Sequence, residues 1–435
     1  MSADALRSLT TDLVARAESC IRSPIGRFAH TWMGAVPEQN SVSDALDGFV
    51  AGDYSAGLFH HDASEASIEL LRHEETRDAS AGSLLNLLDN ANPSGCVHRT
   101  ELAFKCRDVE PAKPIIAQYA LRSTEALGNE WAERHRVYER ASSFVAFCER
   151  EYTGAHGLLL TRSARASGFD NDPMTSGFPP ATVEAPDTNT FMVLEYDALA
   201  QLAQRLGRAE EAASLVERGH RLRSLISTLL YVEDERGGFY RALKWRHECP
   251  HPDHEAIMMP DLEGYMRPIE SWASLLPLYA GIPAPEQAER IIERLLDPAT
   301  YWGPHGIRTV SALSPIYSQS PRSLLYDHRR DKAGLVSNWR GPIWILSNFY
   351  MCKGLRRYGY SAEADELAEK SAQLLIDDLA STGGMHECYD ETGRGLWPPK
   401  PTFVSWNVLA LTMLRDAGYE IPEGADRAGP ASDAP

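Results

Sequence analysis

The chain has 435 residues, of which 43% are hydrophobic and 24% are charged, the composition of an ordinary soluble protein. Its formal net charge of −18 argues against nucleic acid or an anionic membrane as a partner, because both require a basic face. We find no apolar stretch of about 18 residues that could cross a membrane, and no signal peptide at the N-terminus. Seven cysteines without regular spacing indicate reduced thiols, so we expect a cytoplasmic protein.

Helical periodicity dominates the chain from its N-terminus onward. The clear helical segments are 4–22, 62–73, 113–127, 129–152, 188–207, 209–230, 268–279, 286–296, 342–358, 361–379 and 403–416. Several of them form pairs separated by a short break that contains glycine, as at 202–212 and 355–366. Strand-like alternation is local and weak, as in GGFYRAL at 237–243.

Long segments rich in Gly, Pro, aromatic and charged residues alternate with the helical pairs. They are 30–60, 92–112, 154–187, 233–266, 298–341 and 381–402. This alternation predicts an all-α fold, a closed (α/α)6 barrel of helical hairpins whose long loops gather at one mouth. A superhelical stack of hairpins is the competing arrangement, but it would show a recurrent pattern of about 34–45 residues that we do not find. We expect a single catalytic domain over 1–418 and a disordered tail over 419–435.

Two of the long loops carry carboxylates in a setting that suits catalysis. SGFDNDP (167–173) holds Asp170 and Asp172 in a stretch that a structural turn would also explain. GGMHECYD (383–390) holds Glu387 beside an aromatic–acid pair. Two carboxylates on separate loops over one mouth are what glycoside hydrolysis requires, one to protonate the leaving oxygen and the other to activate water.

Aromatic side chains accompany these carboxylates, as expected for a site that binds a sugar. Five tryptophans fall in loops or at helix starts: Trp302, Trp339, Trp344, Trp397 and Trp406. In SNWRGPIW (337–344) the Gly-Pro pair marks a helix start, but Arg340 between two tryptophans favours sugar contact. In GLFHHDASEASIEL (57–70), Asp62 is explained by an N-cap as well as by a role in the site.

The sequence favours neither a metal nor a nucleotide cofactor. HECPHPDHE (247–255) has ligand-type residues, but a second CxxC or HxxxH is lacking, so a lid loop is the favoured interpretation over a zinc site. GxGxxG, P-loop and GxSxG motifs are absent from the sequence. We therefore expect a site without metal or cofactor.

In order and spacing, these motifs resemble glycoside hydrolase family 63, in the clan that it shares with the family 37 trehalases, and most of all its bacterial mannosylglycerate and glucosylglycerate hydrolases. SGFDNDP resembles the family's general-acid motif, which implies that role for Asp170, and GGMHECYD resembles its E-x-Y-D motif, which implies that Glu387 is the general base. NWRGPIW, LFHHDASEA and FVSWNVLALTML resemble further family segments, so that the likeness runs from about residue 55 to 416. The chain departs from the family at Asp172, where relatives carry Ser, and at His61, where they carry Trp.

The resemblance implies an (α/α)6 barrel and an exo-acting, inverting attack on a small α-glucoside or α-mannoside. The side chains that we expect at the sugar, besides the two catalytic carboxylates, are Asp62, Lys113, Phe169, Asn171, Trp339, Arg340, Gly341, Trp344, Tyr389 and Trp406. Two alternatives stay open: a sugar epimerase or isomerase on the same barrel, which would use His pairs, and a sugar-binding protein that has lost activity. In each case the partner is a small carbohydrate, and a homo-oligomer is an open question.

Overall fold

The computed structural model describes residues 2–35, 57–103, 110–244, 258–260, 266–327 and 332–421. The α-helices are α1 (Ala3–Ser19), α4 (His60–Leu70), α5 (Glu74–Asp89), α6 (Ile116–Leu127), α7 (Asn129–Arg134), α8 (Val137–Tyr152), α9 (Ala164–Ser167), α10 (Pro186–Arg205), α11 (Ala209–Leu225), α12 (Pro285–Leu296), α13 (Ile345–Arg357), α14 (Ser361–Thr382) and α15 (Leu409–Asp416). Shorter helical turns are η1 (Ile226–Leu230), η3 (Trp272–Ser274), η4 (Leu276–Leu278) and η5 (Ser405–Val408).

The strands are short and form two-stranded antiparallel ladders around the helices. The pairs are β1 (Ile21–Arg22) with β2 (Trp32–Met33), β3 (Gly57–Phe59) with β4 (Thr100–Leu102), β5 (Val183–Glu184) with β8 (Leu243–Lys244), β6 (Tyr231–Asp234) with β7 (Gly237–Tyr240), β9 (Met258–Pro260) with β10 (Met266–Pro268), β11 (Arg322–Asp327) with β12 (Lys332–Ser337), and β13 (Cys388–Tyr389) with β14 (Gly395–Trp397). The β6–β7 hairpin coincides with the local alternation at 237–243.

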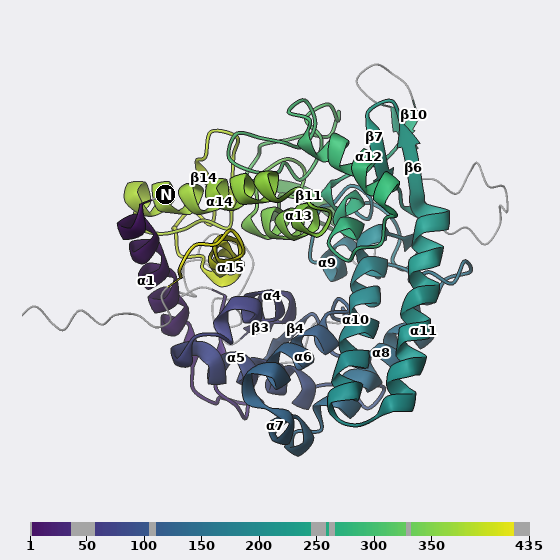
Figure 1. The fold of residues 1–435 in the computed structure, drawn as a ribbon, viewed down its shortest axis with the longest axis vertical. Coiled ribbons are helices and arrows are strands. Elements are labelled where there is room, and N and C mark those ends of the chain that lie inside the picture. Colours follow the sequence, from purple (N-terminus) through teal and green to yellow (C-terminus); the bar gives the residue numbers. More distant parts are fainter. Residues whose placement is uncertain are drawn as a thin grey trace, which may run out of the picture.

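The helices form a closed ring with an outer layer, which confirms the all-α barrel (Figure 1). Among the described elements, α4 packs on α6, α6 on α10, α10 on η4, η4 on α13, α13 on α15, and α15 returns to α4. Outside this inner ring, α5 covers α4, α8 covers α6, α11 covers α10 and α14 covers α13, while α1 bridges α14 and α5. A ring closes because each amphipathic hairpin buries its apolar faces against both neighbours.

A buried ion network joins the first and last helices of the inner ring. Arg415 of α15 donates two hydrogen bonds to Glu69 of α4, at 2.7 and 2.8 Å, and Thr412 and His73 also contact that carboxylate. Burial alone would raise the pKa of Glu69, but the hydrogen bonds from Arg415 and His73 lower it to about 2. The carboxylate therefore stays ionised and paired where the ring closes.

Three helical segments differ from the sequence prediction. α5 was not predicted, because most of its positions are buried and it therefore lacks a polar stripe. The predicted helix 129–152 breaks before α8, where Arg136 has a left-handed φ of 50°. The predicted helix 268–279 is instead η3 and η4, since Pro277 cannot donate to an extended helical ladder.

Candidate active site

Each of the candidate segments leads into the beginning of an inner-ring element. Asp62 lies in the first turn of α4, the SGFDNDP loop follows α9 and precedes α10, and the GGMHECYD segment precedes η5. Contacts between segments show that these beginnings meet: the Ser405 hydroxyl at η5 donates to Asp62 Oδ1 at 2.9 Å. The barrel thus gathers residues that lie hundreds of positions apart in the sequence.

The loop that carries Asp170, which we call the acid loop (167–176), is held by the residue next to that aspartate. The Asn171 side chain donates to Asn338 Oδ1 at 3.0 Å and accepts from the backbone N–H of Trp339 at 2.6 Å. The Arg340 guanidinium donates through Nε to the Asn171 carbonyl at 3.0 Å. Asn171 is fully buried by these contacts, which fix the acid loop on the strand-to-helix connection before α13.

The two acidic residues of the acid loop have separate surroundings. Asp170 is partly exposed, whereas Asp172 is buried and accepts hydrogen bonds from the Met174 N–H at 2.9 Å and the Ser271 hydroxyl at 2.6 Å. Burial raises the pKa of Asp172 to about 7, against the effect of the Ser271 hydrogen bond. Asp172 therefore fixes the turn from the inside, and Asp170 is the acid of this loop that is partly exposed.

The stretch around Glu387, which we call the base segment (384–390), is held by backbone pairing. The Glu387 N–H donates to the Trp397 carbonyl, and Tyr389 exchanges two backbone hydrogen bonds with Ile343, at 2.8 and 2.9 Å. The pairing of β13 with β14 is irregular between Cys388 and Tyr389. The base segment is therefore anchored both to β14 and to the connection that precedes α13.

Three carboxylates act on one another at the mouth of the barrel. The pKa of Glu387 is raised well above its ordinary range by burial and by repulsion from Asp62 and Asp170. The pKa of Asp62 is raised to about 6 by burial, against its Ser405 hydrogen bond, and Asp170 contributes to that rise. All three side chains are partly exposed. Like charges that raise one another's pKa values in this way are typical of sites that transfer protons.

The aromatic residues expected at the sugar form a buried cluster in contact with the acid loop. Trp339 stacks on Trp344 at 3.8 Å between ring centroids, and Phe169 lies 4.9 Å from Trp339. Trp406 lies 5.9 Å from Trp344. At most 4% of each of these residues is exposed. The rings thus pack as a supporting wall, while Asp62, Asp170, Arg340 and Glu387 are the predicted site residues with partly exposed side chains.

Lys113 is buried against two aromatic rings. Its ammonium nitrogen is 3.5 Å from the ring centroid of Phe169 and 4.3 Å from that of Phe191, and the residue is 2% exposed. Burial lowers the pKa of Lys113 to about 7, against the attraction of Asp187. This placement gives Lys113 a cation–π contact with both rings, and its contact with a substrate stays a prediction.

Gly341 and Tyr389 are also placed for structural contacts. Gly341 has a φ of 155°, and a Cβ there would approach the Ser318 carbonyl and the Tyr317 ring to 2.8 Å, so glycine permits the close approach. The fully buried Tyr389 donates its hydroxyl to Asp378 at 2.9 Å. Contact of either residue with a sugar stays a prediction.

Several residues of the site were not anticipated from the sequence. Trp272 lies 4.5 Å from Phe169 and is fully buried, Ser405 binds Asp62, and Asp378 binds the base segment. Asn338 lies inside the SNWRGPIW motif, so of these residues it was the easiest to predict from the sequence. Asp378 and Trp272 lie outside every motif, so a spacing argument had no signal for them.

The described residues show no group of three or more His, Cys, Asp or Glu side chains that could hold a metal ion. The HECPHPDHE stretch lies outside the described ranges.

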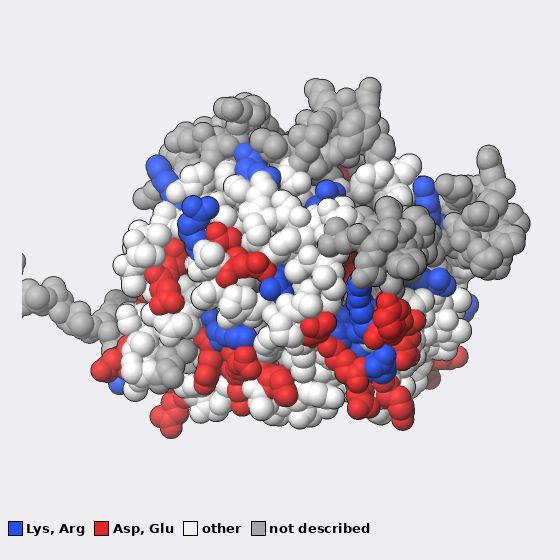
Figure 2. Space-filling view, turned by 90° about the horizontal axis from the view of Figure 1, so that it is seen from above, with Lys and Arg blue, Asp and Glu red and all other residues white. Residues whose placement is uncertain are grey.

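No helix in the described part of the chain is long and apolar enough to cross a membrane. Figure 2 shows acidic and basic side chains interspersed on the face that it presents, where the described residues form no broad basic patch.

The fold defines a class, the all-α barrels built from helical hairpins. Residues 114–398, more than half of the chain, match the mannosylglycerate hydrolase MGH1-like glycoside hydrolase domain, and the chain belongs to this family.

Two curated relatives match part of the chain. The chain is 31% identical over 138 residues to mannosylglycerate hydrolase MGH1 of Selaginella moellendorffii, covering 31% of this chain and 23% of the relative. It is 29% identical over 138 residues to a mannosylglycerate hydrolase of Rubrobacter radiotolerans, covering 32% of this chain and 27% of the relative. The matched segments thus span about a quarter of these relatives.

The fold itself is shared over nearly the whole chain. The crystal structure of the GH63 mannosylglycerate hydrolase from Thermus thermophilus in complex with glucose matches 94% of this chain and 99% of its own, with a TM-score of 0.62 and 18% identity. Neutral trehalase Nth1 from Saccharomyces cerevisiae matches 83% of this chain and 71% of its own, with a TM-score of 0.58 and 16% identity.

Proposed function

We propose that the protein is an exo-acting glycoside hydrolase that cleaves a small α-glycoside with inversion at the anomeric carbon. In this proposal Asp170 is the general acid and Glu387 is the general base. The observation that carries this proposal is the meeting of these two carboxylates, from loops more than 200 residues apart, at one partly exposed site. Each carboxylate rests on its own support, so the two can take different roles.

In the proposed reaction, Asp170 gives its proton to the glycosidic oxygen as the bond from that oxygen to the anomeric carbon breaks. A water molecule attacks the anomeric carbon from the opposite face and loses a proton to Glu387. The products are the β-anomer of the free sugar and the released alcohol. Both carboxyl groups then exchange a proton with solvent to restore the starting state.

The raised pKa of Glu387 has a consequence for the pH at which the enzyme works. The base must be ionised, so activity is lost as the pH falls through the raised pKa of Glu387. Burial and the neighbouring carboxylates thus make Glu387 a stronger base and move the acidic limb of the pH–rate profile upward. Asp62, held by Ser405, is placed to accept a hydrogen bond from a sugar hydroxyl.

For the substrate we propose a glucoside or mannoside of the mannosylglycerate type. The names of the relatives favour such a compound. A single catalytic domain over 1–418 and a cytoplasmic location belong to the same proposal. In the described ranges, Cys20, Cys148, Cys352 and Cys388 are free and buried, which fits a reducing compartment.

The deciding experiment follows the anomer that forms first when mannosylglycerate, glucosylglycerate and α-linked disaccharides are hydrolysed, using proton NMR. The expected result is the β-anomer, with a loss of about 10²- to 10⁴-fold in kcat for Asp170→Asn and for Glu387→Gln. A first-formed α-anomer, or full activity in both variants, would contradict the proposal.

The same experiment addresses the alternatives. An epimerase would convert a free sugar and release no alcohol. The adjacent His60 and His61 are 1% and 5% exposed, and burial lowers the pKa of both, which weighs against a His pair that handles protons at the site. A sugar-binding protein without activity would release no product in either assay.

A further inference from the structure

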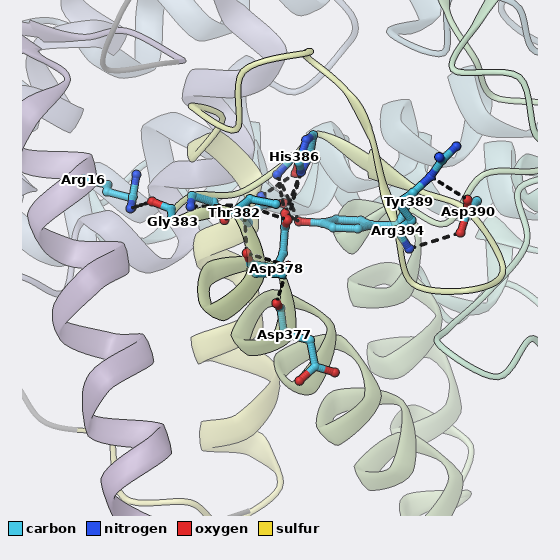
Figure 3. A network of polar contacts seen from close by, with 12 residues as sticks. Arg16, Asp377, Asp378, Thr382, Gly383, His386, Tyr389, Asp390 and Arg394 are labelled. Atoms are coloured by element: carbon cyan, nitrogen blue, oxygen red, sulfur yellow. Dashed lines mark hydrogen bonds and ion pairs between the residues drawn. The ribbon is translucent and has the colours of Figure 1, made fainter.

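A buried carboxylate on α14 binds the base segment on both sides of Glu387. Asp378 accepts hydrogen bonds from the backbone N–H of His386 at 2.9 Å and from the Tyr389 hydroxyl at 2.9 Å. The His386 ring also contacts it through Nδ1, at 2.8 Å to Oδ2 and 3.0 Å to Oδ1. Figure 3 shows these contacts converging on Asp378 from the residues before and after the candidate base.

His386 and Tyr389 both reach the same carboxylate. In a regular strand successive side chains alternate between faces, so His386 and Tyr389 would point to opposite sides. His386 and Glu387 precede β13, which begins at Cys388, so this alternation does not apply to them, and the extra residue at the register shift belongs to β14. The contacts of the His386 ring and the Tyr389 hydroxyl with Asp378 show that both side chains turn toward α14.

Further contacts complete the frame around Asp378. Thr382 donates to Asp378 Oδ1 at 3.1 Å, and Asn407 donates to the His386 carbonyl at 2.9 Å. Burial alone would raise the pKa of Asp378, but the hydrogen bond and the charge of His386 hold it below its ordinary value. The anion is thus kept ionised, and charge-assisted hydrogen bonds of this kind hold their partners more firmly than neutral ones.

We propose that Asp378 is a positioning residue, which fixes the carboxylate of Glu387 against the attacking water by binding His386 and Tyr389. This inference rests on the proposed function, because it assigns Glu387 the role of base. Asp378 itself touches neither water nor sugar in this role. Tyr389 belongs to the same frame, with its hydroxyl committed to Asp378 and to the His386 N–H, which lies 3.1 Å away.

The test compares Asp378→Asn and Tyr389→Phe with two controls. Asp377→Asn changes the neighbouring exposed residue of α14, and Glu69→Gln removes a buried carboxylate that binds a His, an Arg and a Thr elsewhere in the barrel. Glycoside hydrolysis is measured across the pH range, and amide hydrogen exchange is followed in peptides that cover 384–397. All assays are run well below the melting temperature of each variant.

Asp378→Asn is expected to lower kcat by about 10- to 100-fold with KM nearly unchanged, because a misplaced base costs catalysis more than binding. Its acidic limb should move to lower pH, since a released Glu387 loses part of the burial that raises its pKa. Tyr389→Phe, which removes one hydrogen bond, should lower kcat and shift the acidic limb in the same directions, with a fold-change in kcat about a tenth as large. Exchange should rise at 386–389 in both variants and in neither control.

A merely structural role would lower the height of the pH profile without moving its acidic limb. That result, or wild-type exchange at 386–389 in Asp378→Asn, would overturn the proposal. If Glu387→Gln is fully active, the proposed function fails, but the exchange measurement still decides whether Asp378 holds the base segment. The two failures are therefore distinguishable.

Discussion

The acid loop and the base segment face the same site, but the protein holds them by different means. In the acid loop, side chains make the decisive contacts: Asn171 binds Asn338 and the Trp339 N–H, and Asp172 binds Ser271. In the base segment, backbone pairing contributes as well, with Met385 bonded to the Pro401 carbonyl at 3.0 Å and Tyr389 paired with Ile343, and the Asp378 carboxylate adds side-chain contacts to His386 and Tyr389.

This difference suits two carboxylates with different tasks. A turn fixed by its own side chains presents Asp170 at a corner that is partly open to solvent, where a proton can be replaced after each turnover. Backbone pairing holds the segment that carries Glu387, and neighbouring groups raise the pKa of Glu387. The ionised carboxylate therefore binds a proton strongly. In the proposed mechanism, the acid and the base are of similar type, and their different surroundings would distinguish them.

The largest effect expected from this comparison concerns the leaving group. A glycosyl fluoride departs without protonation, so Asp170→Asn should retain activity on an α-glycosyl fluoride within about tenfold of wild type, while losing about 10²- to 10⁴-fold on the glycoside. Glu387→Gln should lose activity on both substrates, because water must still be activated. Fluoride release measured with an ion-selective electrode gives the result, and equal losses in the two variants would show that the two roles are not divided in this way.

An intermediate effect is expected from two glycines, one near each carboxylate. A Cβ at Gly395 would overlap the His386 ring, so Gly395→Ala should displace the base segment and lower kcat by about 10-fold or more. Gly177, just beyond the acid loop, has a φ of 85° and nothing within 4 Å of an added Cβ. Gly177→Ala should therefore cost about 1–2 kcal/mol of stability through backbone strain and leave kcat unchanged.

Thermal unfolding and steady-state kinetics measured on both glycine variants separate strain from displacement. Wild-type kcat in Gly395→Ala would show that the base segment tolerates movement of His386. That result would contradict the expectation that displacing the base segment lowers kcat.

The smallest effect concerns Asp172, which fixes the acid loop from inside. Its folded-state pKa of about 7 lies above the unfolded value, so its contribution to stability is full at acidic pH and is lost as the pH rises through about 7. Asp172→Asn lacks this pH-dependent contribution to stability. Between about pH 5 and pH 8, the melting temperature of the variant should therefore fall by a few degrees less than that of the wild-type protein. Differential scanning calorimetry at the two pH values provides the check, and an identical decline in the two proteins would contradict the assignment.

Much of the barrel was predictable because local signals and the fold agree. The glycine breaks at 202–212 and 355–366 correspond to the α10–α11 and α13–α14 hairpins, whose helices pack against each other. The short turns η3 and η4 were mistaken for one helix, since their apolar residues follow a helical period while a proline interrupts the ladder. α5 was not found, because burial on most sides removes the polar stripe on which that period depends.

The candidate site was predictable to a different degree for each residue. The positions of Asp170 and Glu387 followed from motifs, and their joint presence at the mouth agrees with the structure, whereas their catalytic roles stay predictions. Tyr389 and Lys113 were expected at the sugar, and the structure turns one toward Asp378 and places the other behind Phe169. A motif records the order of side chains along the chain, and it does not say which partner each side chain contacts in the folded protein.

The sequence by itself determined the class of fold and the two loops that carry the carboxylates, because helical period, glycine stops and clustered acids are properties of neighbouring residues. The tertiary structure alone decided which distant side chains hold these acids in place. Asp172 points to Ser271, 99 positions away along the chain, and Asp62 to Ser405, 343 positions away. Such pairs form when the ring of helices closes, and the cost of burying a polar group without a partner then selects the orientation of each side chain.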